Sequence, residues 1–370
     1  ILLAGIIGLF IGVGVARFSY TSLLPSMLED ETLTLTFSGV LASLNYVGYL
    51  SGSIFAIFIK DMNTKVKYFR IGTVLCILTT LIMGITTNDT LWIIGRIVAG
   101  FGSAMALVVG AAIVMTKLNF DDKTKAMGIY FSGIGIALAS SDIISRYVLS
   151  ISTWQNSWIV LTIIGALVTF YPLYILSFDK KTNTSNEKHP LNKSLFSPFV
   201  IILIAAYFTE GVGFVIQGTF LPTILKSIPG LESVAGLSWL LVGLAGIPAA
   251  IIWMKLAHKY GSVNIIIIAM SIQIVGILIP TMSTNMYLNL FCGVLYGGTF
   301  TGLVALFMNL GGKLAGKNPV MLMGALTTAY GIGQVTAPLY AVSLTDWTGN
   351  YDYALYVTAV IVFFGVVMLL

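Results

Sequence analysis

The chain has 370 residues, of which 57% are hydrophobic and 9% are charged, and its formal net charge is +5. Soluble domains carry about 25% charged residues. No water-soluble core accommodates this excess of apolar side chains, so the composition excludes a soluble domain and indicates a membrane protein. The excess of positive charge is explained by the loops, as shown below, rather than by nucleic-acid binding. Because the chain starts at Ile1 and ends at Leu370 within apolar runs, we expect both ends to be trimmed.

Twelve segments are predicted to cross the membrane as helices, because a spanning helix needs about 20 mostly apolar residues. Runs of this length lack the alternation of barrel strands, and their closely spaced Gly, Ser and Thr residues let helices approach one another. The predicted fold class is an all-α membrane protein. The segments are residues 1–25, 37–59, 69–87, 91–117, 125–150, 155–178, 196–225, 233–257, 262–283, 286–312, 320–345 and 351–370.

The second half of the chain repeats features of the first. An offset of 197 residues relates several pairs of positions, and an offset of 198 relates one more. An offset that holds across several segments predicts two homologous six-helix halves, residues 1–178 and 196–370, joined by a flexible polar linker at residues 179–195. The pairs are Leu24-Pro25 with Leu221-Pro222, Gly39 with Gly236, Gly100 with Gly297, and Gly133-Ile-Gly135 with Gly331-Ile-Gly333.

Basic residues are concentrated in alternate loops. The segments 60–70, 117–125, 179–195, 255–259 and 313–317 together hold 15 of the 19 Lys and Arg residues. Cytoplasmic loops carry an excess of Lys and Arg, so both termini and the linker are predicted to be cytoplasmic. We expect the protein to be a multi-pass protein of the bacterial plasma or inner membrane.

Several local sequences resemble the major facilitator superfamily of secondary transporters. The segment Asp61-Met-Asn-Thr-Lys65-Val-Lys67 is similar to its loop between helices 2 and 3, although Thr64 stands where the superfamily usually has Gly. Arg96, followed by small residues, is similar to its fourth helix. The run Ala16-Arg17-Phe18 through Pro25, with Gly331-Ile-Gly333-Gln334 and Pro338, further resembles the YbfB/YjiJ-like bacterial branch.

This resemblance covers essentially the whole chain and implies a mechanism. It implies two halves that rock about a central cavity lined by helices 1, 4, 7 and 10, with Asp61 and Lys65 in a loop that acts as a conformational gate. The fifth helix carries the small residues Gly133 and Gly135 but lacks the Pro that many antiporters of the superfamily have there. The resemblance implies no particular substrate.

Glu210 is the candidate for proton coupling. It lies near the middle of the seventh predicted helix, with Tyr207, Phe214 and Gln217 on the same helical face. Burial without a partner favours the neutral form of a carboxyl group, and ionisable groups inside a membrane mark functional sites. The alternative interpretation is that Glu210 forms a structural pair with Arg17 or another cation of the first half.

Arg17 is the candidate for substrate binding, with Tyr20 three residues later on the same face. A guanidinium offers five donors in a planar fork that suits a carboxylate, sulfonate or phosphate. The alternative is an ion pair between Arg17 and Asp142. Asp142 is also spaced to pair with Arg146 on its own helix; a structural role is favoured for both, with Asp142 the second candidate for proton coupling.

Arg96 is a further candidate for substrate binding, and the alternative is that it extends to the outer membrane interface. Gln217, Tyr296 and Gln334 complete the predicted cavity, although each such polar or aromatic side chain is more often a packing residue. The chain has no phosphate-binding loop, and its two histidines, His189 and His258, are in predicted cytoplasmic regions. We therefore expect no cofactor, no metal site and no enzymatic activity.

The sequence predicts a proton-coupled secondary transporter of a small anionic or zwitterionic organic solute, working by alternating access. Efflux by proton antiport is preferred, and uptake by proton symport or passive facilitation is the alternative. A lipid flippase and a membrane receptor without transport activity are remoter alternatives. The expected partners are the solute, protons and the lipid bilayer, and the chain is expected to be a monomer.

Overall fold

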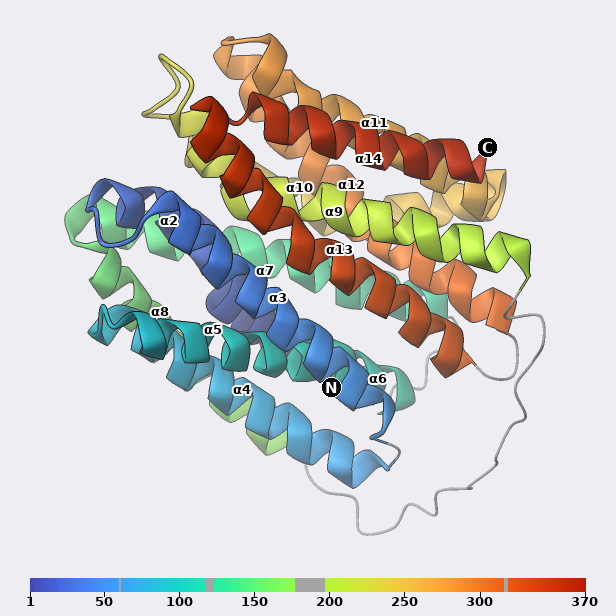
Figure 1. Ribbon diagram of the computed structural model, residues 1–370. Helices are drawn as coiled ribbons and strands as arrows, with labels where there is room; N and C mark the ends of the chain where they lie inside the picture. The colour runs from blue at the N-terminus through green and yellow to red at the C-terminus, as the bar shows by residue number, and fades with distance from the viewer. Residues whose placement is uncertain (60, 118–122, 177–196, 316–318) are drawn as a thin grey trace.

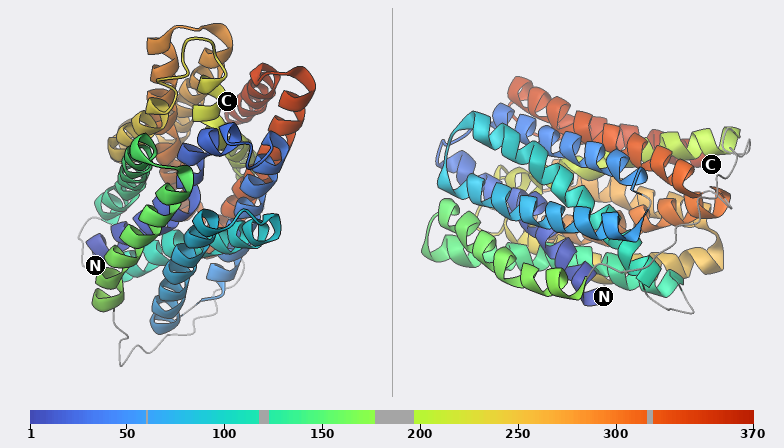
Figure 2. Two further views of the ribbon diagram at one scale, coloured as in Figure 1. Left: turned by 90° about the vertical axis from the view of Figure 1, so that its left-hand side faces the viewer. Right: turned by 90° about the horizontal axis from the view of Figure 1, so that it is seen from below.

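A computed structural model describes the backbone of residues 1–59, 61–117, 123–176, 197–315 and 319–370. Within these ranges all regular secondary structure is helical, so the predicted all-α class is confirmed. The helices form one bundle in which the blue-to-green helices of the first half lie beside the yellow-to-red helices of the second (Figures 1 and 2). Contacts between these two groups run from α2 to α9, from α3 to α13 and from α7 to α10.

The described residues form fourteen α-helices and two π-helices. In chain order they are α1 Leu2–Leu9, the π-helix η1 Phe10–Phe18, α2 Ser19–Glu29, α3 Leu35–Ile57, α4 Met62–Ile85, α5 Asp89–Ala104, the π-helix η2 Met105–Val109, α6 Gly110–Lys117, α7 Lys123–Ile151, α8 Trp154–Ile175, α9 Pro198–Lys226, α10 Leu237–Tyr260, α11 Ser262–Met282, α12 Met286–Ala315, α13 Pro319–Thr348 and α14 Asp352–Leu369. The elements α1, η1 and α2 form one continuous span, Leu2–Glu29, which we call the first span.

Eleven of the twelve predicted spans are confirmed, since eleven helices in the described ranges are long and apolar enough to cross a membrane. The twelfth prediction, 320–345, falls within α13, a helix of 30 residues. α13 is not among the eleven, and it carries polar residues such as Thr327, Thr328 and Gln334. They line a cavity between the two groups of helices, so α13 presents a polar surface to the interior of the bundle.

Glycines let the first span and α9 approach their neighbours closely. A methyl group added at Gly14 would lie 2.6 Å from the carbonyl oxygen of Ala137 in α7. A methyl group added at Gly211 would overlap the carbonyl oxygen of Tyr330 in α13. Gly14 and Gly211 are 197 residues apart, which is the offset found in the sequence. The same kind of close backbone contact therefore occurs at equivalent positions of the two halves.

Other contacts follow the same offset. The hydroxyl of Thr21 in α2 donates a hydrogen bond of 2.6 Å to the carbonyl oxygen of Gly218 in α9, and these residues are also 197 apart. Around a two-fold axis, a residue close to the axis contacts its own counterpart. These contacts support the proposal that residues 1–178 and 196–370 are two related halves arranged around a pseudo-two-fold axis near Thr21 and Gly218.

Candidate functional site

A cavity of about 400 Å³ lies between the two groups of helices. Its wall comes from η1, α3, η2, α6 and α7 on one side and from α9, α12 and α13 on the other. The wall extends to Ile57, Ile59 and Lys65 at the adjoining ends of α3 and α4, which is the side predicted to be cytoplasmic. Among the described residues that line the cavity, the charged ones are Arg17 and Lys65.

Arg17 lies in the cavity wall without a counter-ion. Its side chain is buried, and the guanidinium carbon is 4.3 Å from the ring centre of Tyr49 and 4.7 Å from that of Tyr46. The Nε and Nη2 atoms have no hydrogen-bond partner, and no carboxylate pairs with Arg17 in the part of the chain that the structure describes. A buried cation without a partner is costly, so this arrangement favours an anionic ligand.

The backbone around Arg17 is a π-helix of nine residues, η1. At its end the hydroxyl of Ser19 donates a hydrogen bond of 2.9 Å to the carbonyl oxygen of Gly14, five residues earlier. π-Helical segments are rare and frequently occur at functional sites. Hydrogen bonding from i to i+5 also changes the angular spacing of side chains, so the α-helical spacing used to place Tyr20 beside Arg17 does not apply here.

The expectation that Tyr20 shares the face of Arg17 is therefore wrong. The Tyr20 hydroxyl donates to the carbonyl oxygen of Ser38 at 3.0 Å. Its ring lies 4.5 Å from the guanidinium carbon of Arg96 rather than beside Arg17. Tyr20 is not among the residues that line the cavity, and its contacts stabilise the packing of helices.

Arg96 is buried and does not extend to the membrane interface, so that alternative is wrong. Its Nε donates to the carbonyl oxygen of Leu41 at 3.3 Å, and its Nη1 donates to that of Ala16 at 3.2 Å. Arg96 thus joins α5 to α3 and to η1. It does not line the cavity, and its geometry is that of a structural residue.

Glu210 is fully buried in the middle of α9, behind the cavity wall. Its two carboxyl oxygens make no aligned hydrogen bond within the described part of the chain, although the side-chain amide of Gln273 in α11 lies next to them. The alternative of an ion pair with Arg17 is not seen. Tyr207, one turn before Glu210, does line the cavity, and its ring stacks on that of Tyr330 at 4.6 Å.

The remaining predicted cavity residues divide into two groups. Gln334 in α13 lines the cavity, and its Oε1 atom has no described hydrogen-bond partner. Gln217 instead donates to the carbonyl oxygen of Gly276 at 3.1 Å, and Tyr296 donates to that of Phe214 at 2.9 Å. Gln217 and Tyr296 do not line the cavity, because these bonds hold them against the neighbouring helices of the second half.

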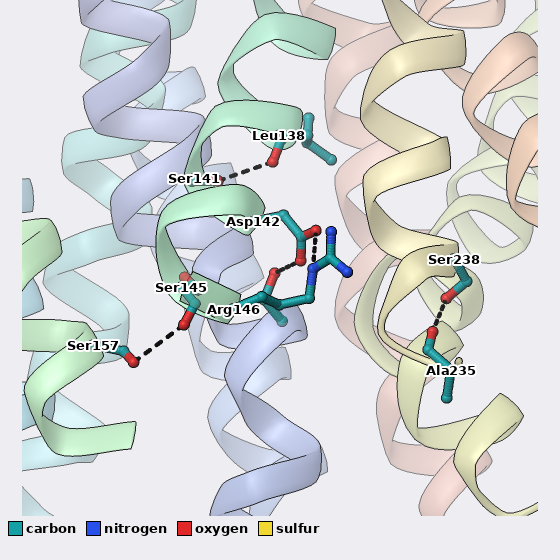
Figure 3. A network of polar contacts seen from close by, with 9 residues as sticks. Leu138, Ser141, Asp142, Ser145, Arg146, Ser157, Ala235 and Ser238 are labelled. Carbon is teal, nitrogen blue, oxygen red and sulfur yellow. Dashed lines mark hydrogen bonds and ion pairs between the residues drawn. The ribbon is translucent and has the colours of Figure 1, made fainter. Parts of the chain in front are cut away.

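Asp142 pairs with Arg146 and not with Arg17, so the Arg17–Asp142 alternative is wrong. The distance from Arg146 Nε to Asp142 Oδ2 is 2.8 Å, and the two side chains point toward each other one turn apart on α7 (Figure 3). Ser22 of α2 donates to Asp142 Oδ1 at 2.8 Å. Asp142 does not line the cavity; it links the first span to α7.

Asp61 and Lys65 lie at the start of α4, near the mouth of the cavity. Asp61 is the N-cap residue, and its Oδ1 accepts a hydrogen bond of 2.8 Å from the backbone N–H of Thr64. Hydrogen bonds from the side chain and backbone of Thr64 lower the pKa of Asp61. Lys65 follows within the first turn and lines the cavity.

Sequence reasoning did not single out the aromatic wall of the cavity. Its members come from the first span, α3, α7, α9, α12 and α13, and they were recognised only in part because each looks like an ordinary packing residue in its own helix. Their shared feature is that they line the same cavity as the Arg17 guanidinium. They are Phe18, Tyr49, Phe131, Tyr207, Phe214, Phe300 and Tyr330.

Comparisons with known proteins identify relatives along most of the chain. The chain is 22% identical over 359 residues to the "Uncharacterized MFS-type transporter YwfA" of Bacillus subtilis (strain 168), covering 90% of this chain and 87% of that protein. It is 24% identical over 293 residues to an "Uncharacterized transporter" of Buchnera aphidicola, covering 74% and 68%. It is also 21% identical over 193 residues to the "Multidrug efflux pump SdrM" of Staphylococcus aureus (strain N315), covering 50% and 42%.

The family described as "Uncharacterised MFS-type transporter YbfB" matches residues 9–370. This match covers nearly all of the chain, including the first span from Leu9 onward and all the helices that line the cavity. Members of this family are membrane transporters rather than enzymes. The chain therefore belongs to the YbfB family of MFS-type transporters.

Proposed function

We propose that the chain carries a small organic anion across the membrane, and that Arg17 binds its charged group. The observation that carries this proposal is the buried guanidinium, which has two hydrogen-bonding nitrogens free and no carboxylate partner among the described residues, in the wall of the cavity. Hydrogen bonds from a guanidinium to an anion are charge-assisted and frequently bidentate. An anion at this position would satisfy a group that the protein itself leaves unpaired.

Transport would proceed by alternating access. The cavity extends to Lys65 at one end of the bundle. At the other end the two halves are held together by the Thr21–Gly218 hydrogen bond and by an ion pair of 2.6 Å between Glu29 and Lys226. Opening this end requires these contacts to break. The conformation described here therefore corresponds to access from the side that the Lys and Arg distribution predicts to be cytoplasmic.

Glu210 would couple transport to protons. Tyr207, one turn before Glu210 in α9, lines the same cavity as Arg17, and its ring stacks on that of Tyr330 at 4.6 Å, so the carboxyl group lies close to the wall that holds the guanidinium. A negative charge on Glu210 therefore opposes an anion at Arg17, and a proton on Glu210 removes that opposition. Coupling is reciprocal, so an anion bound at Arg17 also raises the affinity of Glu210 for a proton. This sign of coupling favours movement of proton and anion in the same direction.

Efflux is the second candidate, and it is the direction that the sequence preferred. One relative is named for it, the Staphylococcus aureus protein described above. A second is named for drug resistance, the "Multidrug resistance protein MdtL" of Klebsiella pneumoniae, 20% identical over 48% of this chain and 46% of that protein. The membrane potential, negative inside, drives an anion outward with about 2.3 kcal/mol per charge at 100 mV. Efflux of an anion therefore requires less free energy from the proton gradient than efflux of a cation.

The test uses proteoliposomes that contain a pH-sensitive dye, with permanently charged organic sulfonates added outside. Sulfonates are chosen because they do not carry protons across lipid by themselves. We expect a sulfonate gradient to acidify the lumen with the wild-type protein and not with Arg17→Gln or Glu210→Gln. Glu210→Gln should still exchange labelled sulfonate, because only the proton step is removed.

The control is Glu232→Gln, which removes an exposed carboxyl group in the α9–α10 connection and should leave both signals unchanged. Normal sulfonate exchange by Arg17→Gln would contradict the role of Arg17. Sulfonate-driven acidification by Glu210→Gln would assign proton coupling to another residue. Wild-type exchange without any proton movement would support the passive facilitator.

A further inference from the structure

We infer that the substrate is an amphipathic organic anion with a flat aromatic body of one or two rings and no cationic group. This inference rests on the proposed anion-binding role of Arg17 and narrows it to a substrate class. The evidence comes from the side chains around the guanidinium, the signs of the charges in the wall, and the volume of the cavity.

Seven aromatic side chains from six helical segments line the cavity: Phe18, Tyr49, Phe131, Tyr207, Phe214, Phe300 and Tyr330. Five of them are linked to one another by ring contacts. The rings of Tyr207 and Tyr330 stack at 4.6 Å, those of Phe214 and Phe300 lie 5.3 Å apart, and Phe18 meets Phe214 edge to face at 6.0 Å. Aromatic rings bind other flat rings by stacked or edge-to-face contacts. The wall therefore suits a planar apolar body better than an aliphatic polar one.

The wall also discriminates by charge. Its described charged members, Arg17 and Lys65, are both cationic, and Glu210 is buried and does not line the cavity. The cationic group of a zwitterion or an organic cation would therefore be desolvated without a partner, which is strongly unfavourable. Of the two solute types that the sequence predicts, anionic and zwitterionic, the cavity accordingly selects the anionic one.

The cavity volume sets the size of the body. An engineered apolar cavity of about 150 Å³ binds benzene, and the cavity described here measures about 400 Å³. It therefore has room for two fused rings and one anionic group. The hydroxyls of Ser53, Thr327 and Thr328 provide a few polar contacts within a mostly apolar wall, as is typical of small-molecule sites.

The experiment measures binding to the full-length chain in lipid nanodiscs by equilibrium dialysis, with empty nanodiscs as the blank. Four probes differ by one property each. The first, 2-naphthalenesulfonate, has the inferred chemistry; 2-naphthalenesulfonamide lacks the charge, an aminomethyl derivative of the sulfonate adds a cation, and ethanesulfonate lacks the rings. We expect the first to bind at least about tenfold more tightly than each of the others, since one charged hydrogen-bonding group is worth about this much.

Variants connect the binding to the cavity. Arg17→Gln should remove the advantage of the sulfonate over the sulfonamide, and Arg17→Lys should retain only part of it because the planar fork is lost. Phe300→Leu should weaken binding of the naphthalene probe by about threefold to tenfold, the effect of one aromatic contact. The matched control Phe363→Leu changes a phenylalanine that is exposed on α14 and should have no effect. The thermal unfolding midpoint of each variant shows whether it is folded.

The outcomes separate this inference from the proposed function. Equally tight, Arg17-dependent binding of ethanesulfonate or of the zwitterion would overturn the substrate class and leave Arg17 as an anion site. Equal binding of sulfonate and sulfonamide, or an unchanged preference in Arg17→Gln, would overturn the proposed function itself. Failure of the naphthalene sulfonate to bind the folded wild-type protein would overturn the inference.

Discussion

The first span, Leu2–Glu29, and α9, Pro198–Lys226, occupy equivalent places in the two halves of the chain and differ in what they hold inside the membrane. Both have a glycine in close backbone contact, at Gly14 and Gly211, and a Leu-Pro pair near the end. The first span contains a π-helix and a cation at the cavity, whereas α9 is a regular α-helix with a carboxyl group behind the cavity wall.

Under the proposed function, this difference gives the two helices different roles. In the proposed mechanism the guanidinium in the cavity wall binds the solute, and the carboxyl group, which does not line the cavity, takes up the proton. If the halves arose from one ancestral unit, a change of a few side chains would have been enough to give equivalent helices the two proposed roles, solute binding and proton coupling. The predictions below test the two sides of this comparison, beginning with the largest effect.

The largest expected effect distinguishes Arg17 from Arg96. Arg96→Met should lower the free energy of unfolding by about 3 kcal/mol, because the carbonyl oxygens of Leu41 and Ala16 lose charged hydrogen bonds. Arg17→Met should leave it unchanged or raise it, because an unpaired buried charge is removed. Thermal unfolding in detergent, without ligand, measures the stability of both variants. Equal destabilisation by the two changes would show that Arg17 is a structural residue.

A smaller effect tests whether the two glycines are equivalent. Gly14→Ala and Gly211→Ala should each lower the free energy of unfolding by about 1–3 kcal/mol. The new methyl group would overlap the carbonyl oxygen of Ala137 in the first variant and that of Tyr330 in the second. Gly298→Ala in α12 is the control. A methyl group there meets nothing within 4 Å, and alanine favours helix, so this change should be neutral or stabilising. A large effect of only one of the two changes would argue against equivalent packing in the two halves.

The smallest effect concerns the contact between the first span and α9. Thr21→Val removes the hydrogen bond to Gly218. Because this contact lies at the end that is closed in the proposed mechanism, the change should raise the equilibrium constant for opening that end by about fivefold. A cysteine placed at Thr219, in a Cys76→Ala, Cys292→Ala background, reports the opening by its alkylation rate. The control Thr345→Val removes only a bond within α13. If Thr21→Val and Thr345→Val gave the same alkylation rate, the opening movement would not involve the contact between Thr21 and Gly218.

Much of the fold was predictable because it depends on composition and periodicity. Apolar runs defined the spans, and the offset of 197 residues is also the separation of Thr21 and Gly218, which are in contact. The ion pair of Asp142 with Arg146 was available from their i, i+4 spacing. Arg17 stood out as a charge in an apolar helix. These features are local, or they repeat at a fixed interval, so the sequence alone contains them.

The unpredicted features depend on contacts between distant segments. The π-helix η1 has no sequence pattern of its own and displaces Tyr20 from the face of Arg17 toward Arg96. The carbonyl oxygens that satisfy Arg96 belong to two other helices. Gln217 and Tyr296 have the side chains expected in a cavity, yet neighbouring backbone carbonyls hold both away from it. Only tertiary structure determines which buried polar groups find partners.

The position of Lys65 at the mouth of the cavity has a kinetic consequence. Lys65 and Arg17 place two positive charges along the entry path inside a low-dielectric wall. Such a path focuses the electric field and raises the local concentration of anions, which accelerates their capture. Mobile ions screen this field beyond about 8 Å at physiological ionic strength. The association rate of an anionic solute should therefore fall as salt is added, and the exposed end of the path at Lys65 should account for most of that dependence.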